Sequence, residues 1–468
     1  MGFWHTRNLV LPLAAACGLT MAAPALPAQQ GGIPGPVGGV QQYNVGELPP
    51  ERSFVISRLS LDEVYDSNVG YAATSGASQA DEVTSISGGI TLEAVKRNSL
   101  FSLVDSTGGL IYDQQTQPNS VVETLNATEK VTLRRWNLLF GENFSYLPNS
   151  AFGLGGQGFL GGGTSGLPGL GGGTGLPGIG VGTGFNPYVV PTQTIVSPNV
   201  SEISTATVFQ AQYAANATSS VSFSGTVGFL HFLGSDLLNS RNVTARFGYD
   251  KSFTARDTIS FSYMASILDY PSGISGFTSH YVQVGYRRLI KQRLHLSLSA
   301  GPVISHFSSQ SGQPVAGGAN PVSWSTYATL DYQVRNGSVS AQYTHGVSAG
   351  SGYLPGSTTD QLSASLTRQI SRVWSVGFPV GFARNTSLEQ TATTVAPTTT
   401  ATFNTWYGGA SLSRPLGHYS SLRFYYNVSR QTGNTIMCVP GVPCPGSIAL
   451  TQIGGMTLTW STRPVPFE

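Results

Sequence analysis

The chain has 468 residues with a formal net charge of +2, and only 10% of its residues are charged, whereas 58 are glycine. An average soluble domain carries roughly 25% charged residues, so this composition disfavours a soluble protein of two or three domains. A net charge this small gives no basis for a nucleic-acid partner. Beyond residue 28 the sequence contains no apolar run of about 18 residues, which excludes transmembrane helices.

Residues 1–28 have the features of a secretory signal peptide. A short basic region precedes the apolar run 9–16, and the small residues Ala25 and Ala28 offer two cleavage positions. Cys17 follows three alanines, a weak likeness to a lipoprotein processing site, but its removal together with the signal is the favoured interpretation. The chain is therefore predicted to be exported.

Residues 29–51 are rich in glycine, proline and glutamine, and we expect a flexible periplasmic segment there. From residue 52 onward, apolar and polar residues alternate in short segments. Between Val339 and Val347, one face carries Val, Ala, Tyr and His, and the other carries Ser, Gln, Thr and Gly. Successive side chains of a strand point to opposite faces, so this pattern indicates strands with one apolar and one polar face. About eighteen strands are predicted, near residues 53–65, 83–95, 99–112, 121–134, 136–147, 203–215, 219–232, 241–251, 257–269, 277–289, 293–306, 322–335, 337–347, 360–371, 374–384, 402–413, 420–430 and 448–461.

The connections between these segments alternate between long and short. Residues 66–82 and 431–447 are long connections, whereas 96–98 and Asn336-Gly337 are short, and the latter dipeptide is typical of two-residue hairpins. An even number of strands places both ends of a bacterial barrel on the periplasmic side. The sequence therefore predicts an all-β fold over residues 52–468: a transmembrane antiparallel β-barrel of about 18 strands with short periplasmic turns and long external loops. Such a barrel belongs in the outer membrane of a Gram-negative bacterium.

The longest connection, residues 148–202, has low complexity and is dominated by glycine. Such a segment buries too little apolar surface to offset the entropy lost on ordering. We expect an external loop here. The alternative is that it folds inward and narrows the pore.

The polar faces of the predicted strands carry mostly hydroxyl and amide side chains. The expected charges in the lumen are few: Asp105, Arg246, Arg287, Asp331, Arg335 and Arg423. They could form a selectivity ring or pair with one another, and a largely neutral wall suits uncharged hydrophilic solutes better than ions. The sequence does not show which face of the strand Glu123 and Glu129 occupy, because they share a face with the apolar residues Leu125 and Val131.

Two further sets of residues could carry chemistry. Cys438 and Cys444 flank a Pro-Gly turn in the last long loop of an exported chain, which predicts a loop disulfide. His231 and Asp236 near an external strand end could belong to an outer-membrane hydrolase, although the spacing alone shows no nucleophile and base in contact. We expect no enzyme activity, no cofactor and no bound metal.

The first predicted strand ends in Tyr65-Asp66-Ser67-Asn68. This ending resembles the opening of the porin-2-like family of outer-membrane β-barrel porins, whose first strand typically ends Tyr-Asp-(Asp/Ser)-Asn. The resemblance implies an outer-membrane channel, linked in some members to exopolysaccharide export. It carries no site residues over to this chain.

Taken together, these features predict a porin-like channel for small hydrophilic, uncharged solutes. A structural or surface-interaction barrel is the alternative, and a hydrolase is the third hypothesis. The expected partners are outer-membrane lipid and lipopolysaccharide around the barrel, a small solute inside it, and the barrel-insertion machinery.

Overall fold

The structure is a computed structural model. It describes residues 52–70, 78–147, 201–233, 237–271, 276–290, 293–307, 322–334, 336–348, 354, 356–388, 401–433 and 448–467. The predicted signal peptide, periplasmic segment, most of the 148–202 loop, Asp236, Arg335, Cys438 and Cys444 lie outside these residues.

The described residues form a closed antiparallel ring. Each strand from β1 to β17 pairs with the next, and β1 also pairs with β18, which closes the barrel. A two-residue strand, β19, follows β18 and pairs with the first residues of β1. The strands are β1 Phe54–Asp66, β2 Asp81–Val95, β3 Ser99–Tyr112, β4 Ser120–Thr132, β5 Trp136–Leu147, β6 Ser201–Asn216, β7 Ser219–Leu233, β8 Ser240–Ser252, β9 Asp257–Asp269, β10 Phe277–Ile290, β11 Leu294–Phe307, β12 Val322–Val334, β13 Gly337–Ser348, β14 Ser357–Gln369, β15 Ser375–Ser387, β16 Thr402–Pro415, β17 Ser420–Gly433, β18 Ile448–Ser461 and β19 Val465–Pro466.

The predicted fold is therefore confirmed: an all-β, antiparallel barrel of eighteen long strands. Among the described residues there is no helix, and none therefore that could cross a membrane. The strand that the sequence did not predict is β19, whose residues lie among the prolines near the end of the chain.

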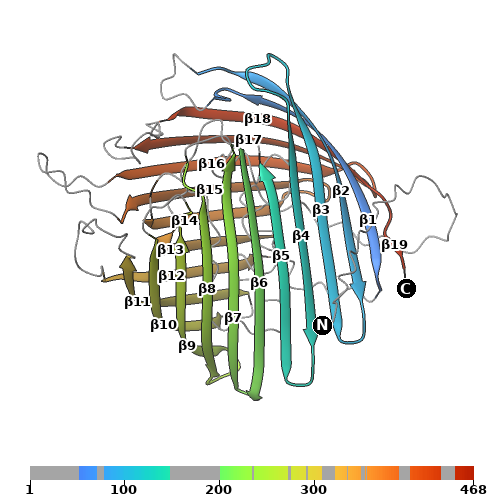
Figure 1. Ribbon diagram of the computed structural model, residues 1–468. Helices are drawn as coiled ribbons and strands as arrows, with labels where there is room; N and C mark the ends of the chain where they lie inside the picture. Colours follow the sequence, from blue (N-terminus) through green and yellow to red (C-terminus); the bar gives the residue numbers. More distant parts are fainter. Residues whose placement is uncertain are drawn as a thin grey trace, which may run out of the picture. The chain divides into compact units, whose positions relative to one another are not determined.

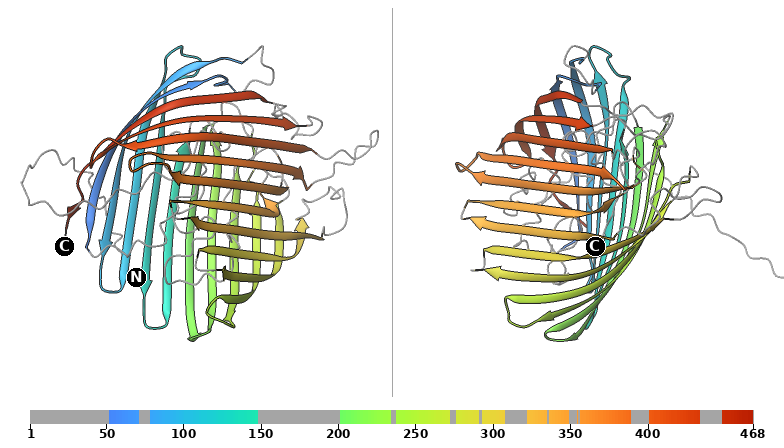
Figure 2. Two further views of the ribbon diagram at one scale, coloured as in Figure 1. Left: turned by 180° about the vertical axis from the view of Figure 1, so that it is seen from behind. Right: turned by 90° about the vertical axis from the view of Figure 1, so that its left-hand side faces the viewer.

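The strands are strongly tilted within the ring. In Figure 1, β2 to β8 run steeply up the picture, whereas β11 to β18 run nearly across it, and the view from behind in Figure 2 shows the same crossing. Two opposite walls of a barrel cross in this way because closure requires each strand to tilt by about 40° from the barrel axis.

All the long connections leave the same end of the barrel, because every odd-numbered strand up to β17 leads into one of them. We call this the long-loop end and the opposite one the short-turn end. At the short-turn end, Lys96 N donates to Ser99 O over 2.8 Å and closes the β2–β3 turn. Gly337 directly follows Asn336 and begins β13. The predicted alternation of long and short connections follows from this arrangement.

The Tyr-Asp-Ser-Asn ending of the first strand forms the corner where β1 meets β18. Asp66 Oδ1 accepts the amide of Asn68 over 2.8 Å, and Ser67 N donates to Gln452 O over 2.9 Å. Asn68 is fully buried, and its Nδ2 reaches Thr451 Oγ1 at 3.4 Å. This corner fixes the first long connection against the strand that closes the ring.

Candidate functional site

The inner face of the barrel carries small polar side chains. In β9, Phe261, Tyr263 and Ile267 are exposed on the outer face, and Ile267 is 51% exposed. The alternating residues Ser262 and Ser266 are buried on the inner face, at 8% and 5%. Equivalent buried positions follow round the ring and include Ser224, Thr226, Thr244, Gln283, Ser297, Ser299, Ser325, Thr329 and Asn427. The barrel therefore has an apolar outside and a hydroxyl-rich inside.

Many of these inner side chains bond to one another across strands. Ser348 Oγ lies 2.7 Å from Thr359 Oγ1, which in turn donates to Asn385 Oδ1 over 2.8 Å. Gln283 Nε2 donates to Ser325 Oγ over 2.7 Å, although β10 and β12 are separated by β11. Such ladders hold the polar wall in place and satisfy hydrogen-bonding groups that have left water.

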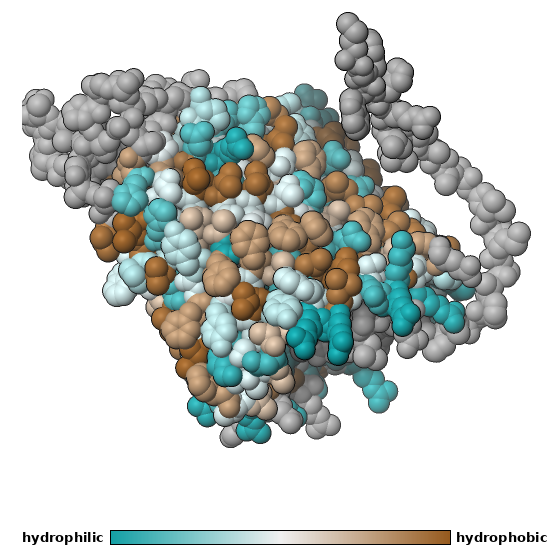
Figure 3. All heavy atoms as spheres, turned by 60° about the horizontal axis from the view of Figure 1, so that its bottom comes forward, coloured by the Kyte–Doolittle hydropathy of each residue, from teal (hydrophilic) through white to brown (hydrophobic). Residues whose placement is uncertain are grey.

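The outer face is mainly apolar over the strands. Figure 3 shows brown and pale side chains across the middle of one face, with teal side chains gathered towards its margins. Membrane β-barrels require such an apolar band on the side that faces lipid. Asp105, Glu123 and Glu129 interrupt it. Glu123 and Glu129 stay in phase with Leu125, because the pairing of β4 with both neighbours shows no bulge.

The expected lumen charges divide into three groups. Arg246 and Arg423 share the faces of buried polar neighbours, Thr244 and Asn427 respectively, and Arg287 and Asp331 also lie on inner faces. The prediction that Asp105 faces the lumen is wrong. Asp105 pairs with Ile90, which is 46% exposed on the outer face, and it therefore faces outward. Arg335 lies outside the described residues.

Two of the expected inner charges, Arg287 and Asp331, have a titratable neighbour on the inner face. Arg287 on β10 interacts electrostatically with Asp250 on β8. Asp331 on β12 is the direct cross-strand partner of His295 on β11. Each of these residues lies within three positions of the short-turn end of its strand. Opposite charges therefore lie near each other at the short-turn end for Arg287 and Asp250.

A third pair lies where the ring closes. Asp62 on β1 and Arg423 on β17 both face Thr457 on β18, as direct cross-strand partners, and they interact electrostatically with each other. Thr457 Oγ1 donates a hydrogen bond to Asp62 Oδ1. The Arg423 guanidinium also lies 5.9 Å from the centre of the Tyr425 ring. Ser85 on β2 completes this group as the other direct partner of Asp62. We call Asp62, Ser85, Arg423 and Tyr425 the seam cluster.

Sequence reasoning missed the seam cluster apart from Arg423. Asp62 alternates in phase with Ser60 and could have been assigned to the polar face of the first strand. The pairing of β1 with β18 brings Asp62 to Arg423, although they are 361 positions apart, and only the closure register reveals it.

Apolar side chains occupy the inner face nearer the long-loop end. One buried cluster contains Met264, Tyr281, Val303 and Tyr327 and extends to Phe277. A second lies beside the seam and contains Val64, Val83, Leu110, Val122 and Ile453. Tyr327 and Val303 are both completely buried. Near the long loops, apolar clusters therefore share the interior with polar side chains such as Ser348, Thr359 and Asn385.

A third cluster joins two distant walls. Leu230 and Phe232 belong to β7, whereas Phe403 belongs to β16, and Leu354 from the β13–β14 connection is buried with them. In a ring of eighteen strands, β7 and β16 are nine positions apart and so lie on opposite walls. The cluster therefore crosses the interior at this level.

Gly356, two residues after Leu354, packs inward as well. It has a φ of +92°, which glycine adopts readily. A Cβ built at this position would lie 2.6 Å from the Phe277 ring of β10 and 3.1 Å from Leu388. Leu354 and Gly356 thus lie against inner apolar side chains of more than one wall.

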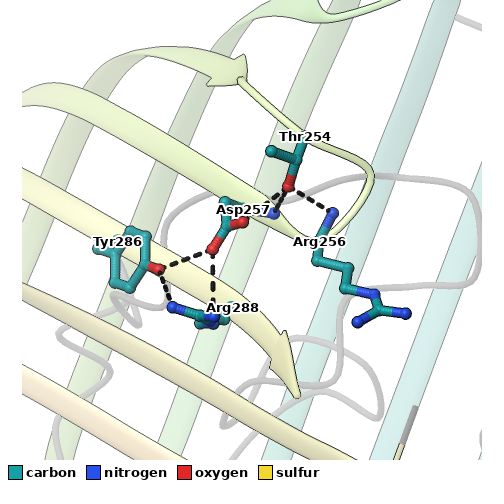
Figure 4. A network of polar contacts seen from close by, with 5 residues as sticks. All are labelled: Thr254, Arg256, Asp257, Tyr286 and Arg288. Atoms are coloured by element: carbon teal, nitrogen blue, oxygen red, sulfur yellow. Dashed lines mark hydrogen bonds and ion pairs between the residues drawn. The ribbon is translucent and has the colours of Figure 1, made fainter. Parts of the chain in front are cut away.

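The short-turn margin holds a network of polar contacts around Asp257, the first residue of β9. Tyr286 OH donates to Asp257 Oδ1 over 2.7 Å, and Arg288 Nε lies 3.7 Å from the same oxygen. Thr254 Oγ1 donates to Asp257 Oδ2 over 2.7 Å and accepts the amides of Arg256 and Asp257 (Figure 4). This network ties the β8–β9 turn to β10.

In the described part of the chain, the structure shows no nucleophile and base in contact at the residues considered for a hydrolase. His231 is exposed on the outer face of β7, opposite Ile203 of β6, and Asp236 lies outside the described residues. Within the described ranges, no three His, Cys, Asp or Glu side chains group as a metal site would need.

No protein-family model matches this sequence, and no curated protein matches it. Solved structures resemble it at low identity. The Pseudomonas aeruginosa protein OpdQ is 10% identical over 88% of this chain and 98% of its own, with a TM-score of 0.42. OccK5 (OpdH) of the same organism is 12% identical over 89% and 99% of the two chains, with a TM-score of 0.42. OccK2 (OpdF), solved in complex with glucuronate, is 9% identical over 87% and 97%, with a TM-score of 0.41.

Proposed function

We propose that the protein is a porin-like channel of the bacterial outer membrane that passes small hydrophilic solutes. One observation carries the proposal: a closed ring of eighteen strands with an apolar outer face and a hydroxyl-lined inner face. A barrel of this size encloses an aqueous passage unless a segment fills it, and the closed ring leaves no unpaired strand edge in lipid.

The preferred solutes in this proposal are uncharged. Asp250 with Arg287, and Asp62 with Arg423, combine opposite signs at short range. Compensated charges produce a weak net field along the passage, so neither cations nor anions are strongly favoured. The hydroxyl and amide side chains between them offer neutral hydrogen bonds.

Liposome swelling tests the passage itself. Liposomes that contain the purified protein should swell faster in iso-osmotic arabinose or glucose than liposomes containing heat-denatured protein. Equal swelling in the two preparations would rule out the channel function for these solutes.

A salt gradient across a planar bilayer tests the solute class. The reversal potential should stay close to zero, because the paired inner charges favour neither ion. A reversal potential near the limit for an ideal cation- or anion-selective pore would contradict the uncharged preference while leaving the channel intact.

The second candidate is a structural or surface-interaction barrel, with a connection to exopolysaccharide export as one form of it. The burial of inner side chains such as Tyr327 and Val303, and the cluster that joins β7 to β16, favour this candidate. Deleting residues 148–200 discriminates between the two. A change in conductance supports a channel that this loop narrows. Loss of surface attachment with unchanged conductance supports the surface-interaction barrel.

Outer-membrane lipid, lipopolysaccharide and the barrel-insertion machinery remain the proposed partners. Basic side chains at the short-turn end, such as Lys96, Arg256 and Arg288, support a contact with lipid phosphates, since long basic chains reach from an apolar surface to the membrane boundary. Separation of inner and outer membranes by density should place the protein in the outer fraction.

A further inference from the structure

We infer that the seam cluster is a binding subsite for a neutral, polyhydroxylated solute such as a sugar. The inference rests on the proposed channel function, because the solute reaches the cluster through the lumen.

Four polar atoms of the seam cluster carry the inference. Within the part of the chain that the structure describes, Asp62 Oδ2, Ser85 Oγ, Arg423 Nη2 and Tyr425 OH are buried and have no hydrogen-bond partner. Asp62 is 1% exposed, and Ser85 is completely buried. Buried polar groups are nearly always satisfied in folded proteins, so four unsatisfied atoms together indicate a partner that arrives from outside the chain.

The four atoms lie on adjacent positions of one wall. Asp62 is the direct cross-strand partner of Ser85, and Thr457 joins Asp62 to Arg423. Tyr425 is the direct partner of Gly455, and a Cβ at position 455 would lie 2.6 Å from Tyr425 OH. Because Gly455 has no Cβ, the Tyr425 phenol has room to lie over it and to extend across the seam towards β1.

The chemistry of the cluster selects the kind of solute. The free carboxylate oxygen accepts a hydrogen bond, the guanidinium donates one, and the two hydroxyls do either. A sugar hydroxyl both donates and accepts, so neighbouring hydroxyls of one ring can satisfy Asp62 and Arg423 together. The tyrosine ring beside them offers a flat apolar surface to the C–H face of the sugar. Asp62 is negative and Arg423 is positive, so a charged solute would be repelled by one of the two.

Three sugars with the same ring but different charge test this directly. Glucose is neutral, glucuronate is an anion and glucosamine is a cation. Each is added to the protein in a planar bilayer, and the concentration that halves the ion current is measured. Glucose should reduce the current at the lowest concentration. Equal potency of all three sugars would overturn the inference.

Substitutions then locate the subsite. Asp62→Asn and Arg423→Gln each remove one charged partner and should raise the half-blocking glucose concentration at least about tenfold, the usual effect of losing a charged hydrogen bond. Asp331→Asn removes an inner carboxylate far round the ring and should keep the wild-type value. Heat-dependent migration on gels verifies that each variant is folded. If glucose blocks the folded Asp62 and Arg423 variants as strongly as the wild type, the inference is wrong.

The failure of the channel function would look different. A protein that inserts but carries no current refutes the channel, and glucose binding is then measured by saturation-transfer NMR on the detergent-solubilised protein. Saturation transfer that is lost in Asp62→Asn supports the subsite even then. Absence of transfer in the wild type, or transfer that persists unchanged in the variant, overturns it.

Discussion

Replacing Leu354 with alanine should weaken the contact that joins two opposite walls of the barrel. Leu354 is 1% exposed and is buried with Leu230, Phe232 and Phe403, which belong to β7 and β16. Because these two strands face each other across the ring, the contact narrows the interior near the long-loop end. Shortening the side chain removes apolar contacts from both walls at once.

The size of the effect follows from the burial of this side chain. Replacing a fully buried leucine with alanine typically costs about 3 kcal/mol. That loss raises the population in which Leu354 is withdrawn from this contact by up to roughly 100-fold. The expected result is a larger mean current or a higher open probability in single-channel recordings.

A matched control separates this effect from a general loss of stability. Leu362→Ala changes the same side chain on the outer face of β14, where Leu362 is 50% exposed. It should leave the open probability near the wild-type value. If folded Leu354→Ala conducts like the wild type and like Leu362→Ala, the crossing contact does not control the passage.

Three substitutions test other parts of the barrel by its unfolding in urea. Asp257→Ala removes the acceptor shared by the β8–β9 turn and β10, and should lower stability. Gly381→Ala should also destabilise, because a Cβ there would lie 2.4 Å from the ring of Tyr407. Asn68→Ala should cost about 1–3 kcal/mol by leaving groups at the closing corner without their buried partner.

Each of these substitutions has a control on the same barrel. Asp113→Ala removes an exposed carboxylate next to β3, and Gly109→Ala adds a Cβ where no atom lies within 4 Å. Asn404→Ala removes an amide from the outer-facing row of β16. These three variants should unfold within about 0.5 kcal/mol of the wild type. Losses as large as those of the test substitutions would show that the assigned contacts are not the cause.

The sequence was sufficient to predict the number of long strands, their order and the sidedness of the connections. These features depend on local patterns: alternation of period two within a strand, and turn residues such as Asn336-Gly337 between strands. The β19 pairing was not predictable, because prolines are poor strand residues and Val465 and Pro466 pair only where β1 offers a free edge.

The facing of a side chain was predictable only where the two faces of a strand differ clearly. In β3 both faces mix apolar and polar residues, so the outward position of Asp105 emerged only from its pairing with Ile90. Asp62 and Arg423 meet through the closure of the ring, and Leu354 meets β7 and β16 through the fold of a connection. Contacts of this kind depend on register and three-dimensional closure, which a local pattern does not contain.

The most direct test of the central claim is the current through single molecules of the purified protein in a planar lipid bilayer. A closed ring with a polar interior should give discrete current steps of uniform size after insertion. A protein that demonstrably inserts as a folded barrel and yet produces no current steps would contradict the channel account.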